Sequence, residues 1–541
     1  MKLSPFAACF TLAMSVCIWG QQLPALSGIQ GQVVNLVTGD PVRKAEVKLS
    51  PVADGGLFSG AAPAGKSAYA GVTDAEGKYN IENVAPGLYS LSATRSGFLE
   101  SRYGARSALQ AGTTLKLPPG EPLKGMVVKI TPQGIVAGKV MDDDGEPIAN
   151  SLVQVFKESY VRGWKMLLPV GSAVTNDRGE YRVANLNPAR YVVQANPPGD
   201  RKIEGAPKEE LTAVYFPGNL EQSQAARIKV GPGAEVAGID IPLRRVPVVR
   251  VKGRLIDGAT GKPLVNTPVS LTPIDSLIPR NVVPIKDDGK FEMPAVTAGS
   301  YILLTMGPAP FQMTVVQPVE VRSRDIENLD LTVMTPAPVP GVIVVDGDKK
   351  LSVNGIQVVL TPSGGMNFYG TATGKAQDDG KFVLKNLSPV KYNLALVGLP
   401  EGAWIKSVLV SGREVLGKEI DWSSGMSGNM RIVLSGDAAT VSGLVQRGDV
   451  PAGGVTVVLL PADVSKRHDI FDKMATTDQF GSFTIRGIAP MEYKVFAFED
   501  LDLGAWQDPD LMNDVESLGE KVVSTAGGAV NVQLKSIPRR E

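Results

Sequence analysis

Histidine and cysteine are nearly absent from this sequence. His468 is the single histidine among 541 residues, and Cys9 and Cys17 are the two cysteines. One histidine excludes metal sites that need several, and it argues against a Ser-His-Asp or Cys-His catalytic centre. A surplus of one charge is also absent, because 55 Lys and Arg residues balance 55 Asp and Glu residues. A balanced surface argues against a nucleic-acid partner, which would require clustered Lys and Arg.

Glycine and proline, in contrast, are abundant. The chain has 59 Gly and 40 Pro residues, together about 18% against an average near 12%. Because 43% of the residues are still apolar, this surplus indicates many turns rather than disorder. The length alone predicts roughly three to five domains.

Residues 1–20 predict an export signal. Lys2 supplies the positive charge, and residues 6–19 form an apolar run that is long enough for a signal and short for a membrane span. We expect cleavage after Gly20; an N-terminal membrane anchor is the alternative. Both cysteines lie in this segment, so the mature chain is expected to have no disulfide and no thiol chemistry. No later stretch reaches 18 apolar residues, which predicts a mature chain without a transmembrane span.

One phrase recurs five times in the rest of the chain. It combines an Asp-containing turn closed by Gly, an aromatic residue two positions later, and usually a Pro followed three residues on by Tyr. The third copy has Ala298 in place of this proline. The closing glycines lie about 100 residues apart and are Gly77, Gly179, Gly289, Gly380 and Gly481. A period of this length predicts one domain for each copy.

Each repeat also opens on Gly followed by alternating valines and closes on a further apolar alternation. Period-2 alternation between Gly and Pro turns is typical of β-hairpins with one buried face. About seven such strands cannot hide their apolar faces in one sheet, so two sheets must pack face to face. The predicted fold is therefore all-β, a tandem array of five antiparallel β-sandwich domains standing in a row. Their expected ranges are 28–132, 133–245, 246–335, 336–436 and 437–541.

Helix signals are scarce in this sequence. The better candidate is 508–518, with Asp508 as N-cap, Pro509 at the first position and an acidic first turn. The segment 463–474 is a second candidate.

The repeat resembles the carboxypeptidase regulatory-like domain, a transthyretin-like (prealbumin-like) sandwich grouped with carbohydrate-binding-like folds and collagen-adhesin B-type repeats. The resemblance rests on G-x-V at each start, the D-x-x-G-x-[YF]-x-[IVL] turn and the P-x-x-Y strand, and it covers nearly the whole mature chain. It implies a transthyretin-like or immunoglobulin-like sandwich but no activity, since these motifs are turn and core residues. In metallocarboxypeptidases such a domain accompanies a zinc peptidase domain. His468 alone cannot supply the two histidines which that zinc requires.

Candidate ligand-binding residues are the tryptophans outside the repeated strands, since aromatic side chains on loops can stack against sugar rings. They are Trp164, Trp404, Trp422 and Trp506. The alternative is that each covers a sandwich edge or an inter-domain contact. The run Asp142–Asp144 before Gly145 suggests calcium, but the Glu of an EF-hand loop is missing, so a hairpin turn is favoured. We predict no catalytic, cofactor or metal residue.

Three functional hypotheses remain. The first is a non-enzymatic, exported, modular binding or structural protein of the cell envelope, whose partner is a polysaccharide or another protein. It would reside in the periplasm, on the outer surface or in the medium. The second is an accessory module for a separate envelope enzyme or outer-membrane transporter. The third, a carboxylate-dependent hydrolase, needs neither His nor Cys, but no carboxylate pair marks it.

Overall fold

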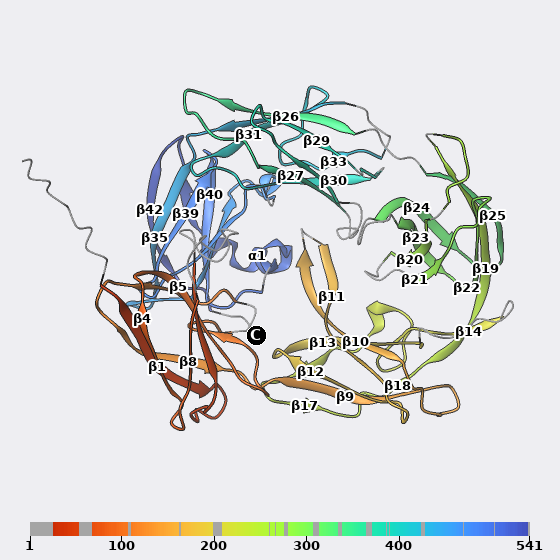
Figure 1. Ribbon diagram of the computed structural model, residues 1–541, viewed down its shortest axis with the longest axis horizontal. Helices are drawn as coiled ribbons and strands as arrows, with labels where there is room; N and C mark the ends of the chain where they lie inside the picture. Colours follow the sequence, from red (N-terminus) through yellow and green to blue (C-terminus); the bar gives the residue numbers. More distant parts are fainter. Residues whose placement is uncertain are drawn as a thin grey trace, which may run out of the picture.

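The computed structural model contains five β-sandwiches built from ten sheets within the residues it describes (Figure 1). Those residues are 25–52, 68–106, 110–161, 164–198, 208–258, 260–265, 267–274, 280–306, 313–333, 338–363, 371–385, 387–388, 390–423, 428–468, 470–502 and 504–538. The predicted export signal lies outside them. Sandwich 1 to sandwich 5 denote the five ranges expected from the sequence.

The first three sandwiches contain strands and one short 3-10 helix. Sandwich 1 has β1 (Ser27–Asn35), β2 (Glu46–Pro51), β3 (Tyr69–Val72), β4 (Lys78–Val84), β5 (Gly87–Thr94), β6 (Ser101–Arg102), β7 (Thr114–Leu117) and β8 (Leu123–Ile130). Sandwich 2 has β9 (Gly134–Met141), β10 (Leu152–Val161), β11 (Trp164–Val174), β12 (Glu180–Leu186), β13 (Ala189–Asn196), β14 (Glu209–Thr212), β15 (Val214–Tyr215), η1 (Gln222–Gln224), β16 (Ile228–Val230), β17 (Glu235–Val236) and β18 (Ile241–Pro242). Sandwich 3 has β19 (Arg244–Asp257), β20 (Val269–Pro273), β21 (Arg280–Val283), β22 (Lys290–Thr297), β23 (Gly299–Met306), β24 (Met313–Val321) and β25 (Ile326–Val333).

The α-helix of the described chain belongs to sandwich 5. Sandwich 4 has β26 (Val339–Asp346), β27 (Gln357–Pro362), β28 (Ala372–Lys375), β29 (Lys381–Leu384), β30 (Lys391–Val397), β31 (Trp404–Val410), β32 (Arg413–Glu414), β33 (Ile420–Asp421) and β34 (Met430–Ser435). Sandwich 5 has β35 (Ala439–Arg447), β36 (Val450–Pro451), β37 (Thr456–Pro461), η2 (Val464–Lys466), β38 (Lys473–Thr476), β39 (Ser482–Ile488), β40 (Glu492–Phe498), η3 (Ala505–Gln507), α1 (Pro509–Val515), η4 (Glu516–Leu518), β41 (Glu520–Val523) and β42 (Ala529–Lys535).

The two helix predictions have different outcomes. Asp508 is the N-cap of α1, its side chain accepts a hydrogen bond from the Asp510 N–H, and Pro509 is the first helical residue, as predicted. The prediction for 463–474 is wrong beyond one turn, because only η2 is helical there and β38 begins at Lys473. Pairing of β38 with β37 supplies the backbone hydrogen bonds that a helix would have made.

The same topology recurs in all five sandwiches. The first strand of each pairs antiparallel with the strand that follows the Asp-Gly turn and parallel with a closing strand; in sandwich 1, β1 lies between β4 and β8. The equivalent parallel pairs are β9 with β17 and β18, β19 with β25, β26 with β34, and β35 with β42. The hairpin pattern predicts the antiparallel pairs only. The parallel pair forms because the closing strand of each sandwich returns beside the first one.

The opening glycine of each repeat permits this parallel pairing. A Cβ atom on Gly31 would lie 1.8 Å from the carbonyl oxygen of Met126, and one on Gly443 would lie 2.1 Å from that of Val532. A larger residue would therefore force the first and closing strands apart.

The turn and the tyrosine of each repeat stabilise their own sandwich. In sandwich 1, Asp74 Oδ1 accepts the Lys78 N–H at 2.7 Å, and Gly77 adopts φ +70°, where glycine is favoured. The Tyr89 hydroxyl donates to the Ala85 carbonyl at 2.7 Å. Tyr191, Tyr301 and Tyr493 bond the carbonyl four residues back in the same way. These rings are buried with the alternating Val, Ile and Leu side chains that fill the space between the sheets.

The five sandwiches do not form the straight row that we expected. They curve into a ring in which sandwich 5 lies beside both sandwich 4 and sandwich 1 (Figure 1). Strand β14 of sandwich 2 pairs with β19 of sandwich 3, and a β-bridge joins Thr114 of sandwich 1 to Asp478 of sandwich 5. The repeat determines each sandwich, but contacts outside the repeat determine how the sandwiches are arranged.

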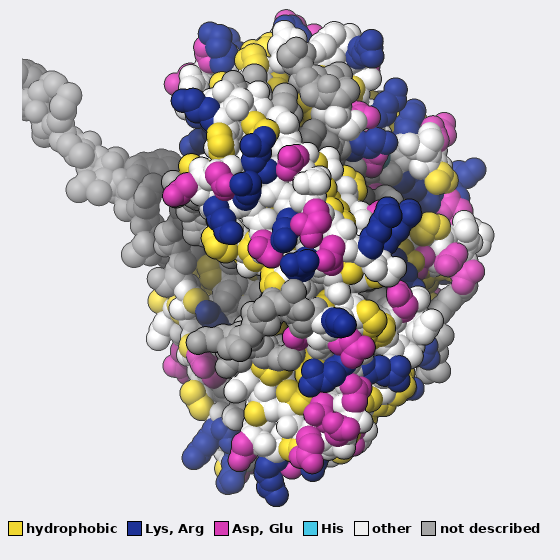
Figure 2. Space-filling model, turned by 90° about the vertical axis from the view of Figure 1, so that its right-hand side faces the viewer, with side chains coloured by type: hydrophobic (Ala, Val, Ile, Leu, Met, Phe, Trp, Pro, Cys, Tyr) yellow, Lys and Arg dark blue, Asp and Glu magenta, His cyan; other side chains and the backbone are white. Residues whose placement is uncertain are grey.

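The outer face at sandwich 3 carries charges of both signs. Figure 2 shows Lys and Arg side chains interspersed with Asp and Glu side chains on this face. No helix among the described residues has the length and apolar character needed to cross a membrane.

Candidate functional site

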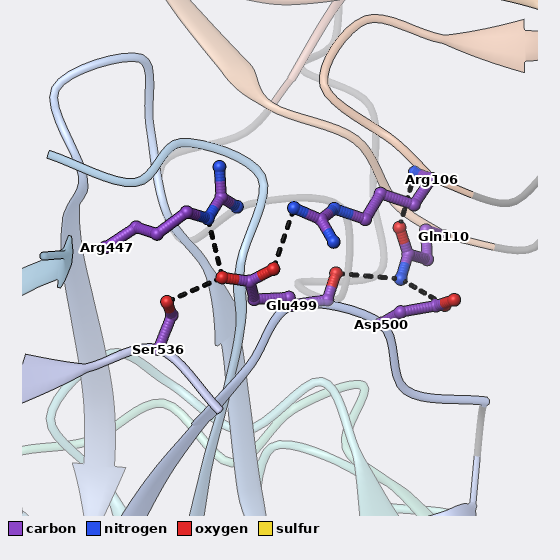
Figure 3. Close-up of polar contacts among 6 residues, drawn as sticks. All are labelled: Arg106, Gln110, Arg447, Glu499, Asp500 and Ser536. Carbon is purple, nitrogen blue, oxygen red and sulfur yellow. Dashed lines mark hydrogen bonds and ion pairs between the residues drawn. The ribbon is translucent and has the colours of Figure 1, made fainter. Parts of the chain in front are cut away.

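A buried carboxylate joins the two ends of the ring. Glu499 follows β40 in sandwich 5, and its side chain is 6% exposed. Arg106 of sandwich 1 contacts it at 2.7 Å, Arg447 of sandwich 5 at 2.6 Å, and the Ser536 hydroxyl donates to it at 2.7 Å (Figure 3). Sandwich 1 therefore supplies one of the two cations that neutralise a carboxylate of sandwich 5.

These contacts lower the pKa of Glu499. Burial by itself favours the neutral acid, but the hydrogen bonds from Arg447 and Ser536, together with the charges of Arg106 and Arg447, outweigh it. Glu499 is therefore ionised at neutral pH, and its negative charge attracts sandwich 1.

Backbone and amide contacts extend this junction. Gln110 Nε2 donates to the Glu499 carbonyl at 3.3 Å and to Asp500 Oδ1 at 2.8 Å (Figure 3). The Lys116 backbone exchanges two hydrogen bonds with the Gln479 side chain, at 2.9 and 3.1 Å. A Cβ on Gly454 would lie 2.6 Å from the Gly104 carbonyl oxygen, so the two backbones are close. We call this set the seam: Gly104, Arg106, Gln110, Thr114 and Lys116 on sandwich 1, and Gly454, Asp478, Gln479, Glu499 and Asp500 on sandwich 5.

Sandwich 2 contacts the same loop of sandwich 5 a few residues further on. Lys157 Nζ lies 2.7 Å from Asp502 Oδ1, and a Cβ on Gly504 would lie 2.0 Å from the Tyr160 carbonyl oxygen. The Tyr160 hydroxyl is hydrogen-bonded to the Asp508 carboxylate. Burial and this carboxylate raise the pKa of Tyr160 to about 12, so the hydroxyl remains a donor at physiological pH.

A cleft opens between sandwich 4 and this part of sandwich 5. It has a volume of about 370 Å³, within the range of small-molecule sites. Sandwich 4 contributes Asn393 and Glu419, and the other lining residues come from the region of β37, η2, η3 and α1. The cleft forms here because α1 packs its Met512 and Val515 against the outer face of β37 and β40, which gives sandwich 5 a third layer.

The walls of the cleft combine an aromatic ring with mostly acidic groups. Four carboxylates line it, those of Glu419, Asp472, Asp508 and Glu516, whereas Arg467 is its one Lys or Arg residue. Arg467 Nη2 lies 2.8 Å from Glu516, so its charge is already neutralised. The cleft is therefore expected to favour neutral or cationic ligands over anions.

Two polar atoms in the cleft walls lack hydrogen bonds. Trp506 Nε1 and Asn393 Oδ1 are both shielded from solvent and have no partner. Leaving a buried donor or acceptor unsatisfied costs about 1–3 kcal/mol. A modest rearrangement of these walls around a ligand that carries hydroxyl groups would therefore be favourable.

The four candidate tryptophans have different surroundings. Trp506 lines the cleft, whereas Trp422 is 1% exposed and packs edge-on against Tyr392 in the core of sandwich 4, so no ring face is open to a ligand. Trp404 begins β31, donates to Asp437 at 2.8 Å and faces sandwich 5, which agrees with the inter-domain alternative. Trp164 begins β11, and its side chain lies outside the described residues.

His468 also lines the cleft, although its charged sequence predicted an exposed loop or a short helix. The Asp142 run forms a hairpin turn, in which Asp142 Oδ1 accepts the N–H groups of Asp144 and Glu146. Within the described part of the chain, no group of three His, Cys, Asp or Glu residues is arranged to hold a metal ion.

Sequence analysis missed the seam. Arg106 and Glu499 belong to no motif, and their pairing depends on the curvature of the whole array. A signal did exist, because residues 499–518 between the tyrosine strand and the next strand have no counterpart in the other repeats.

Comparisons with known proteins agree with the fold. The family model of the carboxypeptidase regulatory-like domain matches residues 28–123 and 135–207. Sandwiches 1 and 2 are therefore carboxypeptidase regulatory-like domains, which confirms the resemblance, and the chain as a whole is a tandem β-sandwich protein. A search of curated proteins found no match.

Several solved structures are similar in fold. The minor pilin GBS52 of Streptococcus agalactiae is 12% identical over 41% of this chain and 97% of its own, with a TM-score of 0.22. Two B repeat units of the collagen binding protein of Staphylococcus aureus are 13% identical over 76% of this chain and 99% of their own, with a TM-score of 0.14. The Bacillus anthracis TIE protein is 14% identical over 74% and 72%, with a TM-score of 0.16.

Proposed function

We propose that this chain is a non-enzymatic, exported binding protein of the cell envelope, and that its ring of sandwiches presents the cleft between sandwiches 4 and 5 to a carbohydrate. The observation that carries this proposal is the cleft itself, whose wall is a segment found in one repeat alone. The repeated residues serve turns and cores, which leaves the unrepeated ones to serve function.

The chemistry of the cleft supports a neutral oligosaccharide as the ligand. The indole of Trp506 offers an apolar face and an unsatisfied N–H donor, and Asn393 offers an unsatisfied acceptor. A sugar hydroxyl can accept from the first and donate to the second. Four carboxylates against one paired arginine disfavour uronates and phosphorylated glycans.

Export is supported by residues 1–20, which have the pattern of a secretory signal, and by the confinement of both cysteines to that segment. A binding role without catalysis is supported by the regulatory-like domains of sandwiches 1 and 2.

The proposal can be tested with residues 21–541 on a glycan array, followed by calorimetry with neutral and uronate-containing hexasaccharides. We expect neutral ligands to bind and Trp506→Ala to weaken their binding at least tenfold. Phe480→Ala, which removes a 57% exposed aromatic ring outside the cleft, should leave the affinity unchanged. If no glycan binds, or if uronates bind more tightly than neutral sugars, the carbohydrate assignment is wrong. A purely structural or protein-binding role would then remain.

A further inference from the structure

One short stretch of sandwich 5 takes part in both ring closure and the cleft. We call residues 499–502 and 504–509 the closure segment. Its first residues, Glu499 and Asp500, bond sandwich 1, and Asp502 and Gly504 then contact sandwich 2. The next residues, Trp506 to Pro509, line the cleft.

We infer that ring closure and ligand binding at the cleft are coupled through the closure segment. Sandwiches 1 and 2 hold this segment at its start, and thereby set the position of the Trp506 ring and of the first turn of α1. The identity of the ligand rests on the function proposed above. The coupling rests only on contacts within the chain.

Sandwich 2 reaches the cleft most directly. The Tyr160 hydroxyl bonds Asp508, the N-cap of α1, and Asp508 itself lines the cleft. Displacement of β10 would remove this donor from a carboxylate that also fixes the helix start. The cleft wall would then lose a constraint at the residues next to Trp506.

The seam has the properties of a contact that can open. Sandwiches 1 and 5 are distant in the chain, and the seam joins them by side-chain bonds and one isolated β-bridge. Arg106 is 45% exposed, so water can replace its bond to Glu499. The unsatisfied Trp506 Nε1 also shows that the present wall position does not satisfy every group of the closure segment.

Coupling of this kind is reciprocal. If the closed ring binds the ligand better than an open one, the ligand must favour closure by the same factor. The ring would then act as a clamp that closes when the cleft is occupied, with the closure segment as its connecting element.

The test uses Arg106→Glu, which places a carboxylate opposite Glu499. Arg106→Lys should rescue closure. Glu327→Gln is the matched control, since Glu327 lies on sandwich 3 and pairs with Arg250 and Lys252 away from the seam. Ring opening is measured as an increase in the radius of gyration by small-angle X-ray scattering. The cleft wall is followed by fluorine NMR of residues 21–541 labelled with 5-fluorotryptophan, with assignments from single Trp→Phe variants.

We expect Arg106→Glu to raise the radius of gyration and shift the Trp506 resonance. The Trp422 resonance, in the core of sandwich 4, should stay in place as an internal reference. Affinity for cellohexaose or maltohexaose, whichever the wild type binds, should fall about tenfold and recover in Arg106→Lys. The control variant should match the wild type in all three readouts.

The possible failures are distinguishable. An open ring with an unchanged Trp506 resonance would overturn the coupling, and an unchanged radius in Arg106→Glu would overturn the assignment of the seam as the closing contact. A shifted Trp506 resonance in a protein that binds neither hexasaccharide would support the coupling and count against the proposed carbohydrate function.

Discussion

The residues that recur in every sandwich and the residues of the closure segment serve different purposes. The recurring turn glycine and tyrosine make their contacts within their own sandwich, as Gly481 and Tyr493 do in sandwich 5. Glu499, Asp502 and Asp508 in the same sandwich instead bond sandwiches 1 and 2. Repetition therefore identifies what folds a domain, whereas departure from repetition identifies what joins the domains.

Sandwich 4 shows the same division from the opposite side. Its tyrosine strand β30 is followed by a short connection to β31, whereas β40 in sandwich 5 is followed by η3, α1 and η4 before β41. Both sandwiches keep a complete core without help from that connection. The longer connection of sandwich 5 thus adds contacts between domains without being required for the sandwich itself.

The largest effect should come from a recurring residue. Gly443→Val would place a side chain 2.1 Å from the Val532 carbonyl oxygen, in the parallel pair of β35 and β42. We expect a loss of at least about 3 kcal/mol in the free energy of unfolding, measured by chemical denaturation. Gly448→Ala is the control, because Gly448 has φ +61° with open space around it and should cost only about 1 kcal/mol. Equal losses in the two variants would show that the close approach is unimportant.

The next effect should come from the seam and should be of a different kind. Glu499→Gln keeps the shape of the side chain but removes the charge that faces Arg106 and Arg447. We expect closure to weaken by about 2 kcal/mol, because a charged hydrogen-bond acceptor in a buried site is lost. Scattering should show an expanded ring while circular dichroism retains the β-sheet signal. Loss of that signal would instead make Glu499 a folding residue of sandwich 5.

A smaller effect is expected for the recurring tyrosine. Tyr493→Phe removes the hydroxyl that donates to the Ala489 carbonyl at 3.0 Å in a buried site. The expected loss is about 1 kcal/mol in the free energy of unfolding, with an unchanged radius of gyration. An expanded ring in this variant would contradict the separation between recurring and closing residues.

Most of the fold could be predicted because its signals are local. A turn glycine, a capping Asp and a buried Tyr each act within a few residues, so their spacing is visible in the sequence. The parallel pair was not visible, because β1 and β8 meet only once the chain between them has folded. The helix at 509–515 was predicted because its N-cap and first proline lie within its own first turn.

The candidate site could be predicted only in part. Trp506 and the helix beside it were singled out because they interrupt the repeat. Their partners could not be found, since Gln110 and Asp500 lie 390 residues apart and meet through the curvature of the ring. Trp422, which also lies outside the repeated strands, is a core residue. Position relative to the repeat is therefore informative about function only together with burial.

Acid should produce the smallest and most specific effect. The carboxyl of Glu499 faces the guanidinium groups of Arg106 and Arg447 and the hydroxyl of Ser536, with the carboxylate of Asp500 next to it in the chain, and its pKa in the closed ring lies below the ordinary value. An opened seam removes Arg106 and so moves this pKa back toward its ordinary value near 4.3. Protons therefore bind the open form more tightly, and the contribution of Glu499 to closure is complete above about pH 4.3 and is lost as the pH falls through the lower value of the closed ring. Scattering should thus give a constant radius of gyration from pH 7 to about pH 5 and an increase below about pH 4. If Glu499→Gln shows the same acid transition as the wild type, other carboxylates are responsible and Glu499 is not the group that closes the ring.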